Sequence, residues 1–216
     1  MFRNKNDVSR IRRSAESGLH QKRLLQQIER LRRELVQARR LACHDSLTGL
    51  PNRALMLDRL KQALSQAARQ RKAVGVLFID LDDFKRVNDV LGHSTGDAVL
   101  QHVATRLLSC IRASDTACRY GGDEFIILLP QMRGMDEVEK VRQKILHHLA
   151  EPHRLGSEVV VVRGSIGSAV FGRDAANCED LIAAADAAMY RAKRSPQRAG
   201  ASRASPRPAA IKRVGM

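Results

Sequence analysis

Two groups of acidic residues stand where a metal site could be built. Asp80, Asp82 and Asp83 follow an apolar run typical of a buried strand, and Asp123 and Glu124 follow a pair of glycines in a hairpin pattern. If these elements are neighbours in one sheet, Asp80 and Asp123 converge, and a cation would relieve the repulsion between their carboxylates. Oxygen ligands without His or Cys favour Mg²⁺ or Mn²⁺. Spacing alone leaves a second interpretation open, in which acidic residues only end strands and occupy turns.

The residues after the first acidic group are typical of a phosphate site. Asp83, Phe84 and Lys85 open a short helix, whose free backbone N–H groups and positive dipole end attract anions. Lys85 adds a point charge, and Gly121 and Gly122 allow a ligand to approach the hairpin backbone closely. The simpler alternative is a solvated lysine and an ordinary glycine turn.

The elements that must position these residues alternate along the middle of the chain. Apolar spacing predicts strands over residues 73–81, 116–120 and 124–129, and two more within 158–171, broken near Gly164. Helices are expected over 54–70, 84–91, 96–111, 136–149 and 179–194. This order predicts an α+β fold with a ferredoxin-like core, in which helices flank a central, mostly antiparallel sheet.

The net charge is concentrated at the ends of the chain. The 216 residues carry a formal charge of +15, which taken whole indicates nucleic acid or an anionic membrane as a partner. Residues 1–42 hold 12 basic and 4 acidic side chains, residues 191–216 hold 8 and none, and residues 43–190 hold 18 and 19. The central segment therefore has no basic excess, and an adaptor for nucleic acid or membrane would have to use the two flanks.

The two flanks are predicted to differ in structure. Residues 1–20 are expected to be a basic irregular segment, and residues 195–216, rich in Ser, Pro, Gly, Ala and Arg, a disordered basic tail. Within residues 21–44 apolar positions recur in steps of four and three, a heptad seam typical of a parallel two-stranded coiled coil. An amphipathic helix lying on its own domain is the alternative. The seam consists of Leu24, Ile28, Leu31, Leu35, Ala38 and Ala42.

Composition argues against several classes of protein. No Trp, two Tyr and five Phe are too few for a base-stacking platform that binds single-stranded nucleic acid. The longest apolar run, 73–79, is too short for a membrane span, and the charged first residues do not resemble a secretory signal. Four Cys without a CxxC pair indicate neither a zinc site nor disulfides, so a cytoplasmic location is expected.

Five motifs occur together in the central segment. Residues 45–53 read DSLTGLPNR, residues 78–85 read FIDLDDFK, and residues 88–97 read NDVLGHSTGD. Residues 119–125 read RYGGDEF and residues 184–193 read AADAAMYRAK, and the five motifs follow the order found in one known family. The chain thereby resembles the GGDEF-domain diguanylate cyclases, which condense two GTP molecules to cyclic di-GMP and two pyrophosphates. The resemblance covers about 150 residues and implies a catalytic domain over 45–194 with a palm-like nucleotide cyclase core.

The resemblance also implies roles by position at the reacting centre. Asp80, Asp123 and the backbone carbonyl of Leu81 match the ligands of Mg²⁺ (or Mn²⁺). Asp123 or Glu124 would help to deprotonate or orient the 3′-hydroxyl, and the sequence does not separate these two roles. Lys85 completes the set of candidate catalytic residues.

Other positions match the residues that bind GTP. Asn88 and Asp97 correspond to the guanine readers, with His93 between them; without the family context, helix capping around Gly92 and Gly96 would be the preferred interpretation of both. The triphosphate contacts correspond to the backbone of Asp83 and Phe84 and to the side chains of Lys85 and Lys193.

The chain departs from the family pattern after this last lysine. The family usually continues with Gly-Arg-Asn, whereas here Pro196-Gln197-Arg198 follow, so Gln197 stands where a phosphate-binding arginine is expected. Arg194 or Arg198 could substitute from a shifted position. A catalytically weak or silent domain that binds GTP or cyclic di-GMP as a regulator is therefore the alternative function within the family.

A further motif matches the site of product inhibition. Arg112 and Asp115 occupy the place of the family's RxxD motif, which binds cyclic di-GMP, and Arg142 is a plausible second contact. Spacing alone would indicate only a surface ion pair. Because each domain binds one GTP, closing a two-fold product requires a homodimer, which the heptad helix would assemble.

Overall fold

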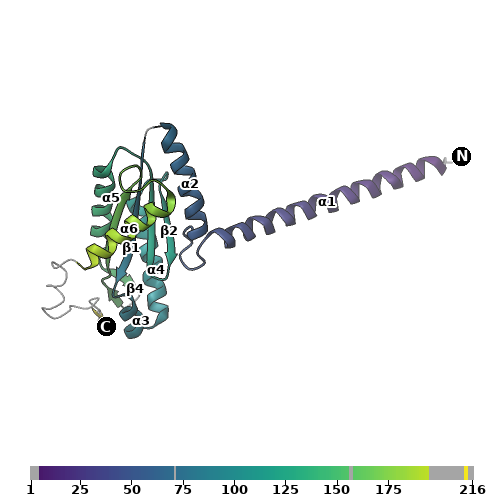
Figure 1. The fold of residues 1–216 in the computed structure, drawn as a ribbon. Coiled ribbons are helices and arrows are strands. Elements are labelled where there is room, and N and C mark those ends of the chain that lie inside the picture. The colour runs from purple at the N-terminus through teal and green to yellow at the C-terminus, as the bar shows by residue number, and fades with distance from the viewer. Residues whose placement is uncertain (1–4, 71, 156–157, 195–211, 214–216) are drawn as a thin grey trace. The chain divides into compact units, whose positions relative to one another are not determined.

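The chain has two parts in the computed structural model, residues 1–42 and 43–216. Structure is described for residues 5–70, 72–155, 158–194 and 212–213. The first part consists of helix α1 (Lys5–Cys43) (Figure 1). This helix corrects the expectation that residues 1–20 are irregular, since residues 5–20 already belong to it. They contain no proline, and their three Arg, with one Lys, one Ala, one Glu and one Leu, favour a helix, so helix formation there does not need an apolar seam.

The apolar seam of α1 is exposed in the single chain. Leu24 and Ile28 are 46% and 41% exposed, and Leu31 and Leu35 are 55% and 52% exposed. A continuous apolar stripe with this exposure is a surface that a second helix could bury. None of the described helices is both long enough and apolar enough to cross a membrane.

A four-stranded sheet forms the centre of residues 43–216. Its order is β2-β3-β1-β6, and each neighbouring pair is antiparallel. This arrangement confirms the predicted α+β core of ferredoxin-like type. The strands are β1 (Ala73–Asp82), β2 (Thr116–Gly121), β3 (Glu124–Met132) and β6 (Arg163–Val170).

A second, small sheet lies outside this core. It contains β4 (His153–Leu155), which the sequence did not predict, β5 (Glu158–Val160) and β7 (Lys212–Arg213). The break between β5 and β6 falls at residues 161–162, so Gly164 lies inside β6. The disordered tail expected over 195–216 lies outside the described residues except for β7, which is paired with β5 rather than irregular.

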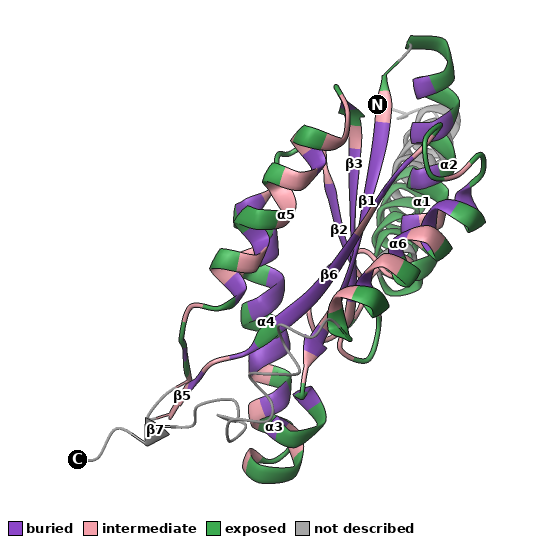
Figure 2. Cartoon of the chain, turned by 60° about the vertical axis from the view of Figure 1, so that its left-hand side comes forward, coloured by how far each residue is buried: buried purple, intermediate pink, exposed green. Residues whose placement is uncertain are grey.

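Helices cover both faces of the main sheet (Figure 2). On one face lie α2 (Arg53–Gln70) and α6 (Cys178–Lys193), and on the other lie α4 (His93–Cys110) and α5 (Met135–Leu149); the short α3 (Phe84–Leu91) connects β1 to α4. Alternate residues of β1 face opposite sides: Val76 and Phe78 pack with α2 and α6, whereas Leu77 and Ile79 pack into the core under α4 and α5. Burial on both faces explains the nearly continuous apolar run of this strand.

One glycine brings α6 unusually close to the sheet. A Cβ atom on Gly167 of β6 would collide with the backbone of α6 at Ala185 and Met189. Only glycine permits this approach, which packs the helix backbone directly on the strand. The approach helps to hold the C-terminal end of α6, where Lys193 is the last residue, beside the end of β1.

Candidate functional site

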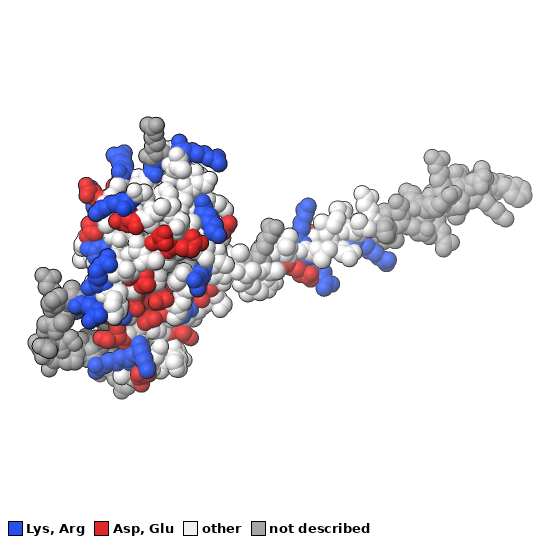
Figure 3. Space-filling view, viewed as in Figure 1, with Lys and Arg blue, Asp and Glu red and all other residues white. Residues whose placement is uncertain are grey.

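The two acidic groups lie together at one end of the main sheet. Asp80 on β1 is paired in register with Glu124 on β3, and the backbone N–H of Leu81 donates to the carbonyl oxygen of Asp123 at 3.3 Å. The tight turn between β2 and β3 places Asp123 at its tip, where Gly122 has a positive φ of 47°. Acidic side chains gather on the face of the domain seen in Figure 3.

These carboxylates affect one another's protonation. Burial raises the pKa of Asp123, and the nearby charge of Asp80 raises it further. Burial likewise raises the pKa of Glu124, with contributions from Asp80, Asp123 and Asp186 of α6. The cluster thus holds more negative charge than the groups around it compensate, which favours the binding of a cation.

Lys193 provides a positive charge within the cluster. Its Nζ lies 2.6 Å from Oδ1 of Asp80, across 113 residues of sequence. Asp82, next on the same face of β1, accepts a 2.7 Å hydrogen bond from the hydroxyl of Ser165, which is fully buried on β6. The end of β1 is therefore fixed from both α6 and β6.

The donor set at this end of the sheet fits a divalent cation that arrives with further ligands. Among the described residues, no three His, Cys, Asp or Glu side chains are grouped as a metal would require. Asp80, Asp123 and the Leu81 carbonyl offer oxygen ligands only, and the ammonium of Lys193 at Asp80 shows that a positive charge is accommodated there. Mg²⁺ is typically held by one or two carboxylates together with phosphate oxygens and water.

The start of α3 lies beside the carboxylates. Asp83 adopts the left-handed conformation, with φ 56° and ψ 26°, and its side chain does not cap the helix. Among the described residues no side chain accepts from the first amides of α3, which suits the binding of an anion. Lys85 is exposed, and its ammonium has no ion pair with any described residue.

Asn88 and Asp97 lie on the two arms of the α3–α4 pair. The side-chain amide of Asn88 packs against Gly96, where an added Cβ would collide with its Oδ1. The backbone N–H of Gly92 donates to the backbone carbonyl of Asn88. The side-chain amide of Asn88 therefore does not cap the helix. Asp97 and His93 are exposed, and the Asp97 carboxylate makes no hydrogen bond or ion pair within the part of the chain described.

The Arg112–Asp115 segment is a turn rather than a side-chain ion pair. Oδ2 of Asp115 accepts from the backbone N–H of Arg112 at 2.9 Å, and the Arg112 side chain is exposed. Lys144 of α5 donates to the carbonyl of Cys110 at 3.1 Å, which holds α5 beside this turn. Arg142, also on α5, makes two hydrogen bonds to Glu139, at 2.6 and 2.7 Å.

A brace that the sequence analysis missed connects the β2–β3 turn to residues 45–52. Arg119 Nε donates to the carbonyl of Gly122 at 2.9 Å, and Nη1 lies 3.2 Å from both carboxylate oxygens of Asp45. Burial raises the pKa of Asp45, but hydrogen bonds from Thr48 and Arg119 outweigh it, so the pKa is lower than usual. The only sequence signal was that Asp45 and Arg119, the first residues of two of the motifs, carry opposite charges, a property that many other residue pairs share.

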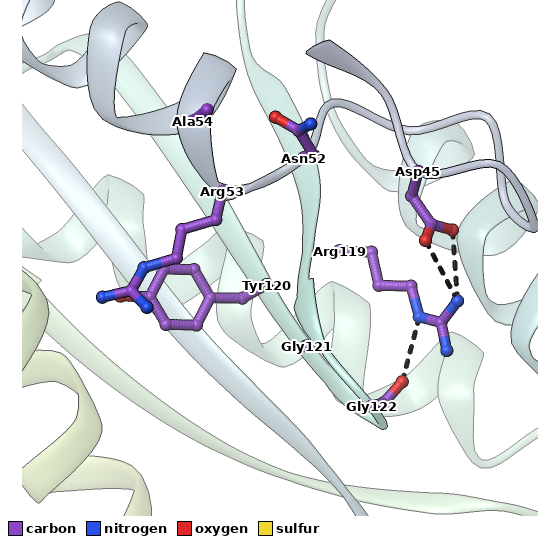
Figure 4. A pocket seen from close by; sticks show the side chains of 8 residues that line it. All are labelled: Asp45, Asn52, Arg53, Ala54, Arg119, Tyr120, Gly121 and Gly122. Atoms are coloured by element: carbon purple, nitrogen blue, oxygen red, sulfur yellow. Dashed lines mark hydrogen bonds and ion pairs between the residues drawn. The ribbon is translucent and has the colours of Figure 1, made fainter. Parts of the chain in front are cut away.

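A pocket of about 410 Å³ lies behind this brace (Figure 4). The guanidinium of Arg53 stacks over the ring of Tyr120, 4.8 Å from its centroid. The lining contains none of the candidate metal ligands, so the pocket is separate from the carboxylate cluster. It is lined by Asp45, Asn52, Arg53, Ala54, Arg119, Tyr120, Gly121 and Gly122.

The departure after Lys193 is only partly visible. Arg194 is the C-cap residue that follows α6, and its guanidinium lies over the ring of Tyr190, 5.5 Å from the centroid. Pro196, Gln197 and Arg198 lie outside the described residues. Ser165 and Asp186 are the other residues at the cluster that sequence reasoning did not identify, since only the packing of β6 and α6 brings them there.

Comparison with protein families gives one match over most of the chain. Residues 42–199 match the model described as diguanylate cyclase, GGDEF domain. The bifunctional diguanylate cyclase/cyclic di-GMP phosphodiesterase MucR of Pseudomonas aeruginosa is 43% identical over 166 residues, which are 77% of this chain and 24% of the relative. The diguanylate cyclase TpbB of the same species is 41% identical, over 76% of this chain and 38% of its own length. The chain thus spans well under half of these curated relatives.

Solved structures share the fold. The coiled coil and GGDEF domain of DgcB from Caulobacter crescentus, in complex with c-di-GMP, gives a TM-score of 0.75 at 30% identity and covers 84% of this chain and 95% of that one. A form of Pseudomonas aeruginosa TpbB that comprises only the GGDEF domain gives a TM-score of 0.68 at 42% identity, covering 70% and 88% of the two chains.

Proposed function

Because this chain belongs to the GGDEF-domain family of diguanylate cyclases, we propose that it condenses two GTP molecules to cyclic di-GMP and two pyrophosphates. The observation that carries the proposal is the carboxylate cluster of Asp80, Asp123 and Glu124, which lies beside the open start of α3. Excess negative charge next to an anion-binding helix end suits a metal–triphosphate complex. Since GTP is the substrate, we place the domain in the cytoplasm.

Recognition of GTP would use the α3–α4 pair and its surroundings. Asn88 and Asp97 present an amide and a free carboxylate, which match the acceptor and the two donors on the edge of guanine. His93 lies between them at the start of α4. The triphosphate would meet the first amides of α3, the exposed ammonium of Lys85, and Lys193.

A divalent cation, Mg²⁺ or Mn²⁺, would be held by Asp80, Asp123 and the Leu81 carbonyl, together with phosphate oxygens. When bound, it would neutralise phosphate charge and favour the attacking oxygen in its deprotonated form. In each of two identical steps, a 3′-oxygen forms a bond to the α-phosphorus of the other GTP and pyrophosphate leaves. Asp123 or Glu124 accepts the hydroxyl proton, directly or through water.

The two-fold product requires two domains that face each other, so we propose a homodimer assembled by α1. Only Cys43 and His44 separate the last seam position from Asp45 and its brace to the hairpin. Leu31→Glu places a charge in the seam, and the rate per molecule should then fall steeply on dilution. Gln26→Glu, on the opposite side of the heptad, is the matched control. Equal dilution curves for the two variants would refute the coil's role.

Product inhibition is proposed at the Arg112–Asp115 turn. The exposed Arg112 guanidinium can bind a phosphate or guanine, and α5 lies close enough for Arg142 to take part after it leaves Glu139. Arg112→Ala should leave the initial rate unchanged and allow cyclic di-GMP to accumulate to a higher concentration. An unchanged inhibition constant would rule this site out.

The proposed activity is tested by incubating the purified full chain with GTP and Mg²⁺. Chromatography with mass spectrometry should find cyclic di-GMP and two pyrophosphates for each product molecule, and Asp80→Asn should yield neither. The replacement of the expected phosphate-binding arginine by Gln197 favours one alternative, a domain that binds GTP or cyclic di-GMP without turnover. A folded dimer that binds either nucleotide but forms no product would establish that alternative and overturn the cyclase.

A further inference from the structure

Lys193 is ion-paired with Asp80, the carboxylate proposed above as a metal ligand. Its Nζ lies 2.6 Å from Oδ1 of Asp80, whose side chain is only 16% exposed. Lys193 is the last residue of α6, and 42% of its side chain is exposed. The ammonium is therefore held at the carboxylate in the nucleotide-free chain, yet it stands at a helix end from which a long side chain can turn away.

Three carboxylates surround this single ammonium. Asp80 accepts a hydrogen bond from this ammonium at 2.6 Å, and the charges of Asp82 and Asp123 also act on it. Asp82 is fixed in this arrangement by the buried hydroxyl of Ser165, at 2.7 Å. A divalent cation added to the same group of carboxylates would meet the repulsion of this ammonium.

We propose that Lys193 is the resident cation of the nucleotide-free site, that it excludes free divalent metal from Asp80, and that the domain therefore accepts its metal as the metal–GTP complex. The inference rests on the proposed function, because it assigns Asp80 to the metal and Lys193 to the triphosphate. Arrival of the triphosphate supplies oxygens to which the ammonium transfers, and Asp80 is then released to the incoming cation. The ion pair between Lys193 and Asp80 is thus replaced by two, one between Lys193 and the triphosphate and one between Asp80 and the cation. No covalent bond changes.

The proposal predicts opposite effects of one substitution on two ligands. Lys193→Met removes the competing charge, so affinity for Mn²⁺ in the absence of nucleotide should increase by at least about fivefold. The same change removes a triphosphate contact, so affinity for GTP should decrease. A lysine with only a structural role would not improve binding of the metal alone.

The experiment titrates the nucleotide-free full chain with Mn²⁺ and follows free Mn²⁺ by electron paramagnetic resonance. Lys193→Met and Lys193→Gln are compared with Arg191→Met, which removes the same charge from an exposed position on the same helix. Arg191→Met should stay within about twofold of the unmodified chain, because distant exposed charges are screened by salt. Asp80→Asn combined with Lys193→Met should abolish the gain.

The proposal is overturned if both Lys193 variants bind Mn²⁺ no more tightly than the unmodified chain, including no measurable binding by any of them. It is also overturned if Arg191→Met gains as much. These outcomes do not depend on turnover. A chain that forms no cyclic di-GMP but shows the fivefold gain would refute the proposed activity and retain the exchange at Asp80.

Discussion

The carboxylates around Asp80 and the guanidinium of Arg106 are both charged groups at the edge of the same core, yet they are compensated in opposite ways. At the end of β1, the ammonium of Lys193 is shared among Asp80, Asp82 and Asp123. At the junction of α4, α5 and β4, Arg106 donates to the carbonyls of His148, Glu151 and Pro152, at 3.0, 2.6 and 2.6 Å.

The second cluster leaves little for a ligand to bind. A guanidinium can only donate, so the 3.0 Å contact from Arg106 makes Nε2 of His153 the acceptor. His153 is fully buried, and burial together with Arg106 and His102 lowers its pKa to about 4. The contacts of Arg106 join α4 to the C-terminal end of α5 and to the residues that lead into β4, which is a structural role. The comparison teaches that uncompensated charge marks the functional end of the domain, and compensated charge marks a support.

The largest effect expected from a substitution outside the carboxylate cluster tests whether functional side chains can be displaced without harm to the fold. Gly96→Ala places a methyl group where the amide of Asn88 lies. Because a small misplacement of a substrate-positioning group is costly, the cyclase rate at low GTP should decrease about 100-fold. Ala favours a helix over Gly by about 1 kcal/mol, and this gain opposes the strain of moving the Asn88 side chain. Any decrease in the free energy of unfolding should therefore be no larger than that strain. Steady-state kinetics measures the cyclase rate, and urea unfolding measures the free energy of unfolding. Ser94→Ala, on the same helix, is the control. An unchanged KM for GTP in Gly96→Ala would contradict the prediction.

The next effect should appear in stability alone. Arg106→Met removes three charge-assisted hydrogen bonds to backbone carbonyls and the contact with the buried His153, so the free energy of unfolding should decrease by about 3 kcal/mol. Arg69→Met, at an exposed position of α2, should change it by less than about 0.5 kcal/mol. Urea titration measures both variants. A loss of cyclase rate per folded molecule in Arg106→Met would break the distinction between the two clusters.

His153 predicts a pH dependence of similar size. The unfolded chain protonates this imidazole near its ordinary pKa of 6.5, whereas the folded chain does so only near about 4. Between these values the unfolded state binds more protons, so stability is full above pH 6.5 and decreases as the pH falls toward 4, by up to about 3 kcal/mol. In urea unfolding across this range, the stability of His153→Gln should depend less on pH than that of His147→Gln, the control that removes an exposed imidazole. Parallel curves for the two variants would contradict the assignment.

The smallest effect concerns Arg119, which combines both kinds of role. Its guanidinium is compensated by Asp45 and by the Gly122 carbonyl, but the turn that it supports carries Asp123. Lys cannot reproduce the two-sided contact. Arg119→Lys should therefore decrease the cyclase rate about fivefold and stability by about 1 kcal/mol. The cyclase rate and the free energy of unfolding should both decrease in this variant. A decrease in the rate alone would give Arg119 a purely functional role, and a decrease in stability alone would give it a purely supporting one.

The sheet and most helices could be predicted because local patterns determine them. Burial on both faces gives β1 its continuous apolar run, and the glycine pair at 121–122 identifies the β2–β3 turn that brings Asp123 to Asp80. Strand β4 was missed because three residues give no readable period. The start of α1 was placed too late because its first residues form helix without an apolar stripe.

Contacts between distant segments could not be predicted. The Lys193–Asp80 ion pair spans 113 residues, and the Ser165–Asp82 hydrogen bond spans 83, so each depends on the packing of α6 or β6 on the finished sheet. The left-handed conformation of Asp83 also has no sequence signal stronger than the tolerance of Asp for it. The residue types of the site were readable from the sequence, whereas the sharing of one ammonium among its carboxylates required the fold.

The most direct test measures stability and product formation on one variant, Asp123→Asn. Burial and the charge of Asp80 raise the pKa of Asp123 in the unmodified chain, so the charged carboxylate of Asp123 opposes folding at neutral pH. The variant should unfold at the same urea concentration as the unmodified chain or a higher one, while cyclic di-GMP formation falls by at least about 1,000-fold, since nucleophile activation and charge stabilisation are both lost. Retained product formation, or a loss of rate explained by a loss of folded protein, would contradict the account.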